Sequence, residues 1–285
     1  MHVTGEMIFN SSSFPGRHLE HTCCEIVKPF HRGAIIPAVN TGYIDLEFGQ
    51  IYGSYRRDFV PVEVGMLIHR SDDDNIIMRG SRFEFNGGVV LRKNSLDSLG
   101  NSIGLEERVY NPKLSRLTEY DPHYRESRRK RLRKEPQVMN IFASLGDFCR
   151  KVIDEHEVKR LVFFGGQEDR HLLARADFSL RGMATSDLQK ELHREVGDIL
   201  SLDKTSIVIR YHTEGRRIRS RHFEYVVPEV FRPLLRPHKA VGDAARTFLL
   251  DREFGSYRKE VVSAMRRHMK RIKRYREQGD EIPIF

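Results

Sequence analysis

The spacing of apolar and polar residues divides the chain into a strand-rich first part and a helix-rich second part. Between residues 39 and 85, short β-branched and apolar runs are separated by polar turns, a pattern typical of β-strands. It predicts strands at 39–48, 62–69 and 76–85. Because these strand patterns follow one another in quick succession, with no helical pattern between them, we expect the strands to form an antiparallel meander.

Helical spacing begins near residue 139. Ile141, Leu145, Phe148 and Val152 recur three or four positions apart, which places them on one face of a helix. The apolar run at 161–164, ended by two glycines, predicts a short strand. The remaining predicted elements are helices at 168–176, 187–200, 239–251 and 256–277 and a β-hairpin at 206–226.

The order of these elements favours an α/β fold. Strands first, and alternating helices and strands afterwards, imply a mixed β-sheet (an antiparallel meander plus parallel strands) that is flanked by helices. We expect an irregular segment at 1–37, a main domain at 38–255 and a basic amphipathic C-terminal helix at 256–285. Two insertions are expected in the main domain, a polar loop near 93–137 and the hairpin at 206–226.

The cysteine content and the hydropathy of the chain narrow the choice of cellular compartment. Cys23, Cys24 and Cys149 include no CxxC pair, so neither a disulfide framework nor a structural zinc site is expected. A reducing intracellular compartment, the cytoplasm, fits this usage best. No apolar run approaches the roughly 18 residues of a membrane span, so no membrane partner is expected.

The charge of the chain points to a polyanionic partner. Its formal net charge is +9 and its isoelectric point is about 9.5. Basic residues gather at 125–134 and at 266–276, and the predicted hairpin adds arginines. Either run alone is more simply explained as a solvated face, but together they favour contact with a phosphate backbone. The residues expected to make this contact are Arg128, Arg129, Lys130, Arg131, Arg216, Arg217, Arg219 and Arg221.

Two carboxylates on the first predicted strand suggest metal chemistry. Asp45 and Glu47 are two positions apart, so both point to the same face of the strand. Two carboxylates on a core face repel each other and are costly to bury without a cation. A divalent metal with a preference for oxygen ligands, Mg²⁺ or Mn²⁺, would relieve that cost. An isolated D-x-E triplet is more often a pair of exposed acids, so further residues are needed.

Later segments supply more acids and a histidine. Asp169 lies in the first turn of a helix that follows a strand. A carboxylate at this position interacts favourably with the helix dipole, and it points toward the end of the sheet. His238 precedes a later helix, and Asp243, five residues on, lies inside it among apolar neighbours. The acids at 72–74 are a rival metal cluster, but we interpret them as solvated residues of a turn.

The order of these motifs resembles the DEDDh class of 3′→5′ exonucleases. The segment 43–47 looks like the first motif of that superfamily, 162–173 like the middle motif and 238–250 like the last, while 62–67 is similar to its second strand. The resemblance covers 38–251. It implies a ribonuclease H-like fold and a metal-dependent exonuclease that releases nucleoside 5′-monophosphates.

The resemblance also assigns roles in a site for two Mg²⁺ or Mn²⁺ ions. Asp45 would bridge both ions. Glu47 and Asp243 would hold the ion that binds the attacking water. Asp169 would support the second ion. His238 would accept the proton of the water, a task suited to a group that titrates near neutrality.

The implied substrate is nucleic acid with a 3′ end, DNA or RNA, single-stranded or overhanging. The chain departs from the pattern of the superfamily at two points. Phe48-Gly49-Gln50 replaces a Thr-rich turn, and Gly165 stands where the middle motif usually has an asparagine. Two other hypotheses stay open. One is a catalytically silent nucleic-acid-binding module, and the other is an assembly subunit that docks through its basic C-terminal helix.

Overall fold

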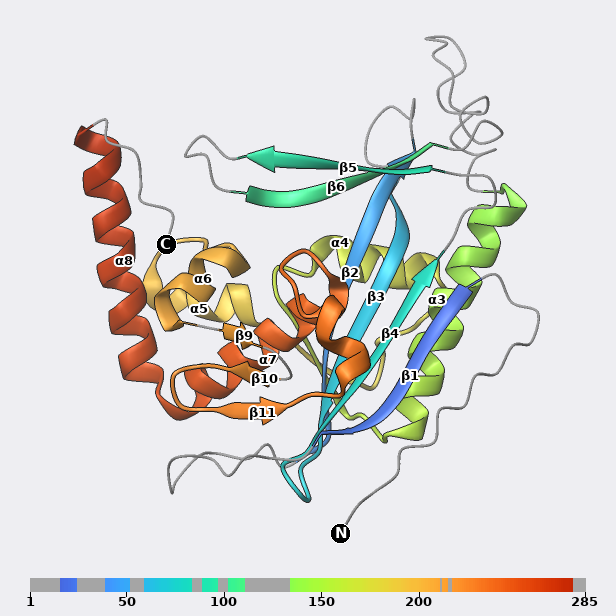
Figure 1. Cartoon of the computed structure of the whole chain (residues 1–285), viewed down its shortest axis with the longest axis horizontal. Coiled ribbons are helices and arrows are strands. Elements are labelled where there is room, and N and C mark those ends of the chain that lie inside the picture. Colours follow the sequence, from blue (N-terminus) through green and yellow to red (C-terminus); the bar gives the residue numbers. More distant parts are fainter. Residues whose placement is uncertain are drawn as a thin grey trace.

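A mixed β-sheet lies at the centre of the fold (Figure 1). The computed structural model describes residues 16–24, 39–51, 59–83, 89–96, 102–110, 134–210, 212–214 and 217–278. Within these residues the sheet has eight strands. They are β1 (Gly16–Cys24), β2 (Thr41–Ile51), β3 (Phe59–His69), β4 (Ile76–Phe83), β5 (Val89–Leu96), β6 (Ser102–Tyr110), β7 (Arg160–Phe163) and β8 (Ala184–Asp187).

Strand β2 occupies the middle of this sheet. β3 runs antiparallel to β2 and β4 antiparallel to β3, so the predicted meander is confirmed. On the other side, β7 is parallel to β2 and β8 is parallel to β7. The order through the centre is therefore β4-β3-β2-β7-β8, and the predicted α/β class with a mixed sheet is confirmed. β1 extends the sheet beyond β4, and the β5–β6 hairpin joins the far end of β2 through β6.

The helices of the described residues lie on both faces of the sheet (Figure 1). They are α3 (Pro136–Glu155), α4 (Gln167–Arg175), α5 (Leu188–Val196), α6 (Leu202–Ile209), α7 (Ala240–Ser256), α8 (Arg258–Gln278) and the 3₁₀-helix η1 (Glu229–Leu234). A second, small sheet contains β9 (His212–Glu214), β10 (Arg217–Arg219) and β11 (Glu224–Val226). None of the described helices is long and apolar enough to cross a membrane.

Alternation along β2 sends its side chains into two separate cores. Leu46 packs with α3 and α4 on one face of the sheet. Tyr43 faces the other way, where its ring meets Phe248 of α7 with centroids 5.2 Å apart. Successive side chains of a strand point to opposite faces. Asp45 and Glu47 therefore share one face of β2, as the spacing predicted, and it is the face of Tyr43, which α7 covers.

The helix predicted to begin near residue 139 is α3. Its proline at residue 136 occupies the first turn, where a missing backbone N–H costs nothing. The predicted apolar face is confirmed, because Ile141, Leu145, Phe148 and Val152 are all buried. This face covers the sheet on the side opposite α7.

Three parts of the predicted layout are wrong. The segment 1–37, expected to be irregular, contains β1, and the expected loop at 93–137 contains the second half of β5, all of β6 and the start of α3. Polar and charged residues interrupt β6, so its strand character comes from backbone pairing with β5 and β2 rather than from its own pattern. The helix expected at 187–200 ends at Val196, because Gly197 adopts the left-handed conformation that terminates helices.

The predicted hairpin at 206–226 is also wrong in its first half. The β-branched run at 205–209 belongs to α6, where Thr205 turns its hydroxyl back to the Leu202 carbonyl at 2.7 Å. Packing of α6 against α7 and α8 overrides the strand propensity of that run. The remainder forms β9, β10 and β11, so a hairpin does follow, but it begins at residue 212.

Candidate metal centre

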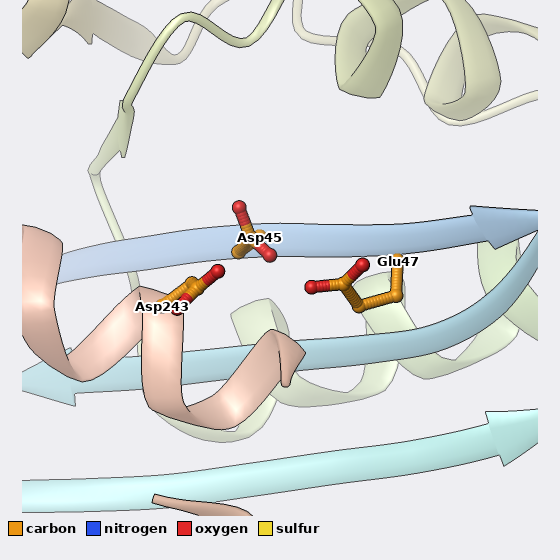
Figure 2. Close-up of side chains that lie close together, drawn as sticks. All are labelled: Asp45, Glu47 and Asp243. Atoms are coloured by element: carbon orange, nitrogen blue, oxygen red, sulfur yellow. The ribbon is translucent and has the colours of Figure 1, made fainter. Parts of the chain in front are cut away.

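Three carboxylates from two elements meet on the α7 face of the sheet. Asp45 and Glu47 come from β2, and Asp243 comes from the first turn of α7. One carboxylate oxygen of each lies within 4.8 Å of one from each of the other two. Figure 2 shows the three carboxylates facing one another across the gap between strand and helix. The structure therefore brings together three of the residues that the sequence singled out.

A glycine in β3 makes this meeting possible. Gly65 lies directly opposite Asp45 in the sheet. A Cβ atom added at Gly65 would stand 2.3 Å from the carbonyl carbon of Ala240 and 2.3 Å from the amide nitrogen of Val241. The first turn of α7 thus rests directly on the β3 backbone, beside Asp45. Sequence reasoning missed Gly65, although a glycine inside an apolar strand signals close backbone approach.

Ion pairs hold the beginning of α7 against the same strand. Lys239, which precedes the helix, places its Nζ 2.7 Å from Oε1 of Glu63 in β3. Arg82 of β4 contacts the same carboxylate oxygen at 2.8 Å. Both Lys239 and Glu63 are largely buried. The first turn of α7 is therefore fixed by charge as well as by its contact with Gly65.

Asp169 approaches the cluster from α4. Its side-chain Oδ1 accepts a hydrogen bond from the backbone N–H of Leu46 at 3.0 Å, between the two acids of β2. The helix begins after a turn that Asp187 supports, since its Oδ1 accepts the Gly165 N–H at 3.0 Å. Asp169 is buried and close enough to Asp45 to affect its ionisation. The fourth predicted carboxylate therefore lies beside the cluster. It is hydrogen-bonded to β2, the strand that carries Asp45 and Glu47.

His238 lies beside the cluster with a strained backbone. Its φ of 60° is in the left-handed region, and its N–H donates to Asp243 at 3.2 Å to Oδ2 and 3.3 Å to Oδ1. The imidazole Nε2 lies 3.5 Å from Oδ2 of Asp203 in α6. The backbone of His238 thus orients Asp243, while Asp203 orients the imidazole.

Arg246 supplies positive charge that sequence reasoning missed. It is buried one turn after Asp243, and its Nε donates to Oδ1 of Asp243 at 3.0 Å. Its Nη1 donates to Oδ1 of Asp203 at 2.6 Å. The spacing of three positions between Asp243 and Arg246 on a helix was the signal available in the sequence. Arg246 holds Asp243 in place and links it to the carboxylate beside His238.

The electrostatics of the cluster favour protons or cations over free carboxylates. Loss of hydration raises the pKa of Asp45 well above its ordinary value, and the charge of Asp243 raises it further. Asp169 and Glu47 act in the same direction. Burial also raises the pKa of Asp243, against the opposing effect of Arg246. Among the described residues, the guanidinium of Arg246 opposes the rise in pKa of both Asp45 and Asp243 but does not outweigh it, and a divalent cation would offset the remaining repulsion.

Asp169 shows the same imbalance in a milder form. Burial raises its pKa to about 7, from an ordinary value of 3.8. Hydrogen bonds from its own N–H and from that of Leu46 favour the charged form but do not outweigh burial. Oxygen donors from carboxylates are the ligands that Mg²⁺ and Mn²⁺ prefer. The donor set and the charge of the site fit such an ion.

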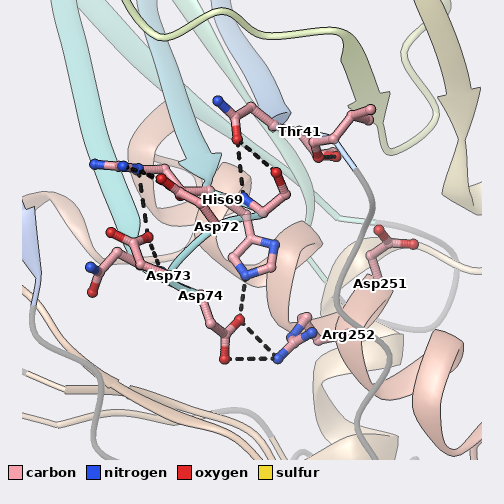
Figure 3. Close-up of polar contacts among 12 residues, drawn as sticks. Thr41, His69, Asp72, Asp73, Asp74, Asp251 and Arg252 are labelled. Atoms are coloured by element: carbon pink, nitrogen blue, oxygen red, sulfur yellow. Dashed lines mark hydrogen bonds and ion pairs between the residues drawn. The ribbon is translucent and has the colours of Figure 1, made fainter.

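The rival cluster at 72–74 is built differently (Figure 3). Asp72 and Asp73 are exposed in a turn and both contact Arg70, so the interpretation as solvated acids is confirmed for them. It is wrong for Asp74, which is buried between His69 and Arg252, with the guanidinium Nη2 3.0 Å from Oδ1. Asp74 reaches this place through a left-handed backbone, φ 56°. These bonds already satisfy its carboxylate, which ties the β3–β4 turn to α7.

The basic residues expected to contact a phosphate backbone are only partly within the described chain. Arg128, Arg129, Lys130, Arg131 and Arg216 lie outside it. Arg217 of β10 pairs with the largely buried Glu224 at 2.8 Å, and Arg221 pairs with the exposed Glu260 at 3.3 Å, and both guanidinium groups are exposed. Arg219 also lies on β10. An exposed pair such as that of Arg221 and Glu260 contributes little to stability.

Comparison with family models and with curated protein sequences identifies no relative of this chain. The function proposed below rests on the residues of the cluster themselves. Three carboxylates meet there, and that of Asp169 accepts a hydrogen bond from the strand segment between Asp45 and Glu47. Arg246 partly balances the negative charge.

Proposed function

We propose that this chain is a metal-dependent 3′→5′ exonuclease of the DEDDh class, with a ribonuclease H-like fold. It would hydrolyse phosphodiester bonds at the 3′ end of DNA or RNA and release nucleoside 5′-monophosphates. One observation carries the proposal: Asp45, Glu47 and Asp243 place carboxylate oxygens within 4.8 Å of one another, although they come from segments about two hundred residues apart.

The arrangement of the sheet supports the same proposal. The strand order β4-β3-β2-β7-β8, with β3 antiparallel and β7 parallel to β2, is compatible with a ribonuclease H-like sheet. The acids lie on β2, the central strand, and the helix that carries the last aspartate packs over it. The motifs that suggested the DEDDh resemblance are therefore adjacent in space as well as ordered along the chain.

Each residue of the site would have a distinct task. Asp45, Glu47 and Asp243 would hold Mg²⁺ or Mn²⁺, and Asp169 would support a second ion from its position on the Leu46 N–H. Such ions supply an activated water and neutralise charge on the reacting phosphate. His238 would accept a proton from the water, and Asp203, 3.5 Å from Nε2, would keep the imidazole oriented.

The proposal is tested by digesting oligonucleotides of DNA and RNA that carry a label at the 5′ end. We expect a ladder that shortens from the 3′ end one nucleotide at a time with Mg²⁺ or Mn²⁺, and none with excess EDTA. The Asp45→Asn variant should lose the activity, and Asp72→Asn, a change to an exposed acid of the rival cluster, should keep it. Full activity in EDTA, or degradation from the 5′ end, would refute the proposal.

One contact favours the alternative of a silent nucleic-acid-binding module. Arg246 already pairs with Asp243, and in a silent protein this pair would replace the cation. Such a protein would bind oligonucleotides equally well with Mn²⁺ and with EDTA and would leave them intact. The digestion assay and a binding measurement on the same oligonucleotide separate the two functions.

A further inference from the structure

A basic groove runs along the outer surface of α8. It has a volume of about 590 Å³ and lies between α8 and the end of α5. Figure 1 shows α8 at one end of the molecule, and the helix packs against α5, α6 and α7. The side chains that line the groove are Glu195, Arg258, Lys259, Val262, Ser263, Arg266, Arg267 and Lys270.

Apolar contacts fix the helix that carries this groove. Val261, Met265 and Ile272 are buried, so the apolar stripe predicted for the C-terminal helix packs inward. Helical spacing then directs the basic residues outward. An amphipathic helix packed on its own domain accounts for the stripe, but it does not account for the concentration of one charge on the outer face.

The basic residues of the groove lie along one side of the helix. Lys259, Arg266 and Lys270 are separated by seven and four positions, so they fall close to one line, and Arg267 lies beside that line. At 1.5 Å per residue, the line from Lys259 to Lys270 is about 16 Å long. Such a line matches a chain of repeating negative charges better than it matches a single small anion.

Among the described residues, only part of this positive charge is paired with a carboxylate or a backbone carbonyl. Arg258 pairs with Glu195, and Arg266 donates to the Glu195 carbonyl at 3.2 Å through Nε, which joins α8 to the end of α5. Lys259, Arg267 and Lys270 form no ion pair with a carboxylate in the described part of the chain. Arg267 does donate to Ser263 at 2.6 Å, a contact that leaves its charge uncompensated.

The surface offers little to a protein partner. Protein interfaces depend on buried apolar or aromatic anchors and are depleted in lysine. Among the described residues of α8, no large apolar side chain is exposed. A nucleic-acid backbone needs no such anchor, because neutralised phosphates and released counterions supply most of its affinity.

We propose that the α8 groove binds the phosphodiester backbone of a single nucleic-acid strand. The proposal rests on the proposed function for the identity of that strand, which is the substrate of the carboxylate cluster. The groove contributes affinity and not chemistry, since none of its residues belongs to the cluster. Lys259, Arg267 and Lys270 make the phosphate contacts, and Arg258 and Arg266 hold the groove in shape.

The test is the binding of a fluorescent single-stranded oligonucleotide in EDTA, measured by anisotropy over a range of salt concentrations. The groove variant combines Lys259→Gln, Arg267→Gln and Lys270→Gln. Losing three phosphate contacts should reduce the salt slope by about 0.7 each and raise the Kd on the order of 10–100-fold near 0.1 M salt. A control with the same charge loss combines Lys159→Gln, Arg181→Gln and Lys190→Gln and should bind as the unchanged chain does.

Further arms separate the possible outcomes. Lys259→Arg with Lys270→Arg keeps the charge and should preserve binding, and thermal melts should show all variants folded. Equal Kd and salt slope in the groove variant and the control would overturn the proposal. So would a labelled polyglutamate that binds as tightly as the oligonucleotide and is lost in the same variant. Tight, groove-dependent binding by a chain that never hydrolyses the oligonucleotide would refute the exonuclease but leave the groove intact.

Discussion

Replacing Gly65 with alanine would test whether the contact between α7 and β3 sets the geometry of the cluster. The new methyl group would stand 2.3 Å from two backbone atoms of α7, at Ala240 and Val241. Because those atoms belong to a helix and not to a flexible side chain, the helix itself has to move. Asp243 would move with it, away from Asp45 and Glu47.

The size of the effect follows from the contact distance. Ordinary carbon contacts begin near 3.4 Å, so the first turn of α7 must retreat by about 1 Å. Overpacking of this kind destabilises a protein by about 1–3 kcal/mol. A misplacement of about 1 Å in a catalytic group can cost on the order of 10²-fold in rate. We therefore expect a folded protein with a modestly lower Tm and about a hundredfold loss of hydrolysis.

The assay compares hydrolysis rate, Mn²⁺ affinity and Tm for Gly65→Ala and Gly255→Ala. Gly255 lies near the end of the same helix, and a Cβ atom there would meet nothing within 4 Å. This control should keep full activity and gain about 0.5–1 kcal/mol of stability, the usual effect of removing a glycine from a helix. A Gly65→Ala protein with normal rate and normal Mn²⁺ affinity would refute the reasoning that this contact positions Asp243.

Three further predictions follow from the site. His238→Gln should lower the single-turnover rate by about 10²–10⁴-fold and leave Mn²⁺ binding intact in calorimetry, and a near-normal rate would exclude the imidazole as the base. Arg246→Gln should destabilise the cation-free protein by roughly 3–5 kcal/mol in denaturant unfolding, because Asp243 loses a buried partner, and Mn²⁺ should restore part of the loss. In EDTA, Tm should fall as pH rises from about 4 to 7, because buried Asp169, whose pKa is raised to about 7, stays protonated while its unfolded counterpart ionises near 3.8. Mn²⁺ should suppress this trend, and a cation-free Tm that is flat or rising over the same range would contradict it.

The local spacing of apolar and polar residues was sufficient to predict much of the fold and part of the site. Alternation along β2 placed Asp45 and Glu47 on one face, and helical spacing identified the buried face of α3. Both inferences concern neighbouring residues of one element, whose geometry the backbone period determines. The position of Asp243 within a helix was predictable in the same way.

Contacts between distant segments were not predictable from pattern. Gly65 and Arg246 each carry a local signal, a glycine inside an apolar strand and a charge three positions after Asp243, but that signal does not identify the distant backbone or carboxylate that each residue contacts. Asp74 belongs to a polar turn by sequence, yet Arg252, far along the chain, draws it into the interior. The β-branched run at 205–209 likewise forms part of helix α6, because packing against α7 and α8 outweighs its strand propensity. Each failure comes from tertiary contacts that override local preference.

The central claim is that Asp45, Glu47 and Asp243 together hold a divalent cation. Calorimetric titration of the cation-free chain with Mn²⁺ tests it most directly, with Asp45→Asn and Asp72→Asn as the paired variants. The account predicts that the unchanged chain and Asp72→Asn bind Mn²⁺ alike and that Asp45→Asn loses most of the binding, because the Asp45 carboxylate lies within 4.8 Å of both other carboxylates of the cluster. Equal Mn²⁺ binding by Asp45→Asn and the unchanged chain would contradict it.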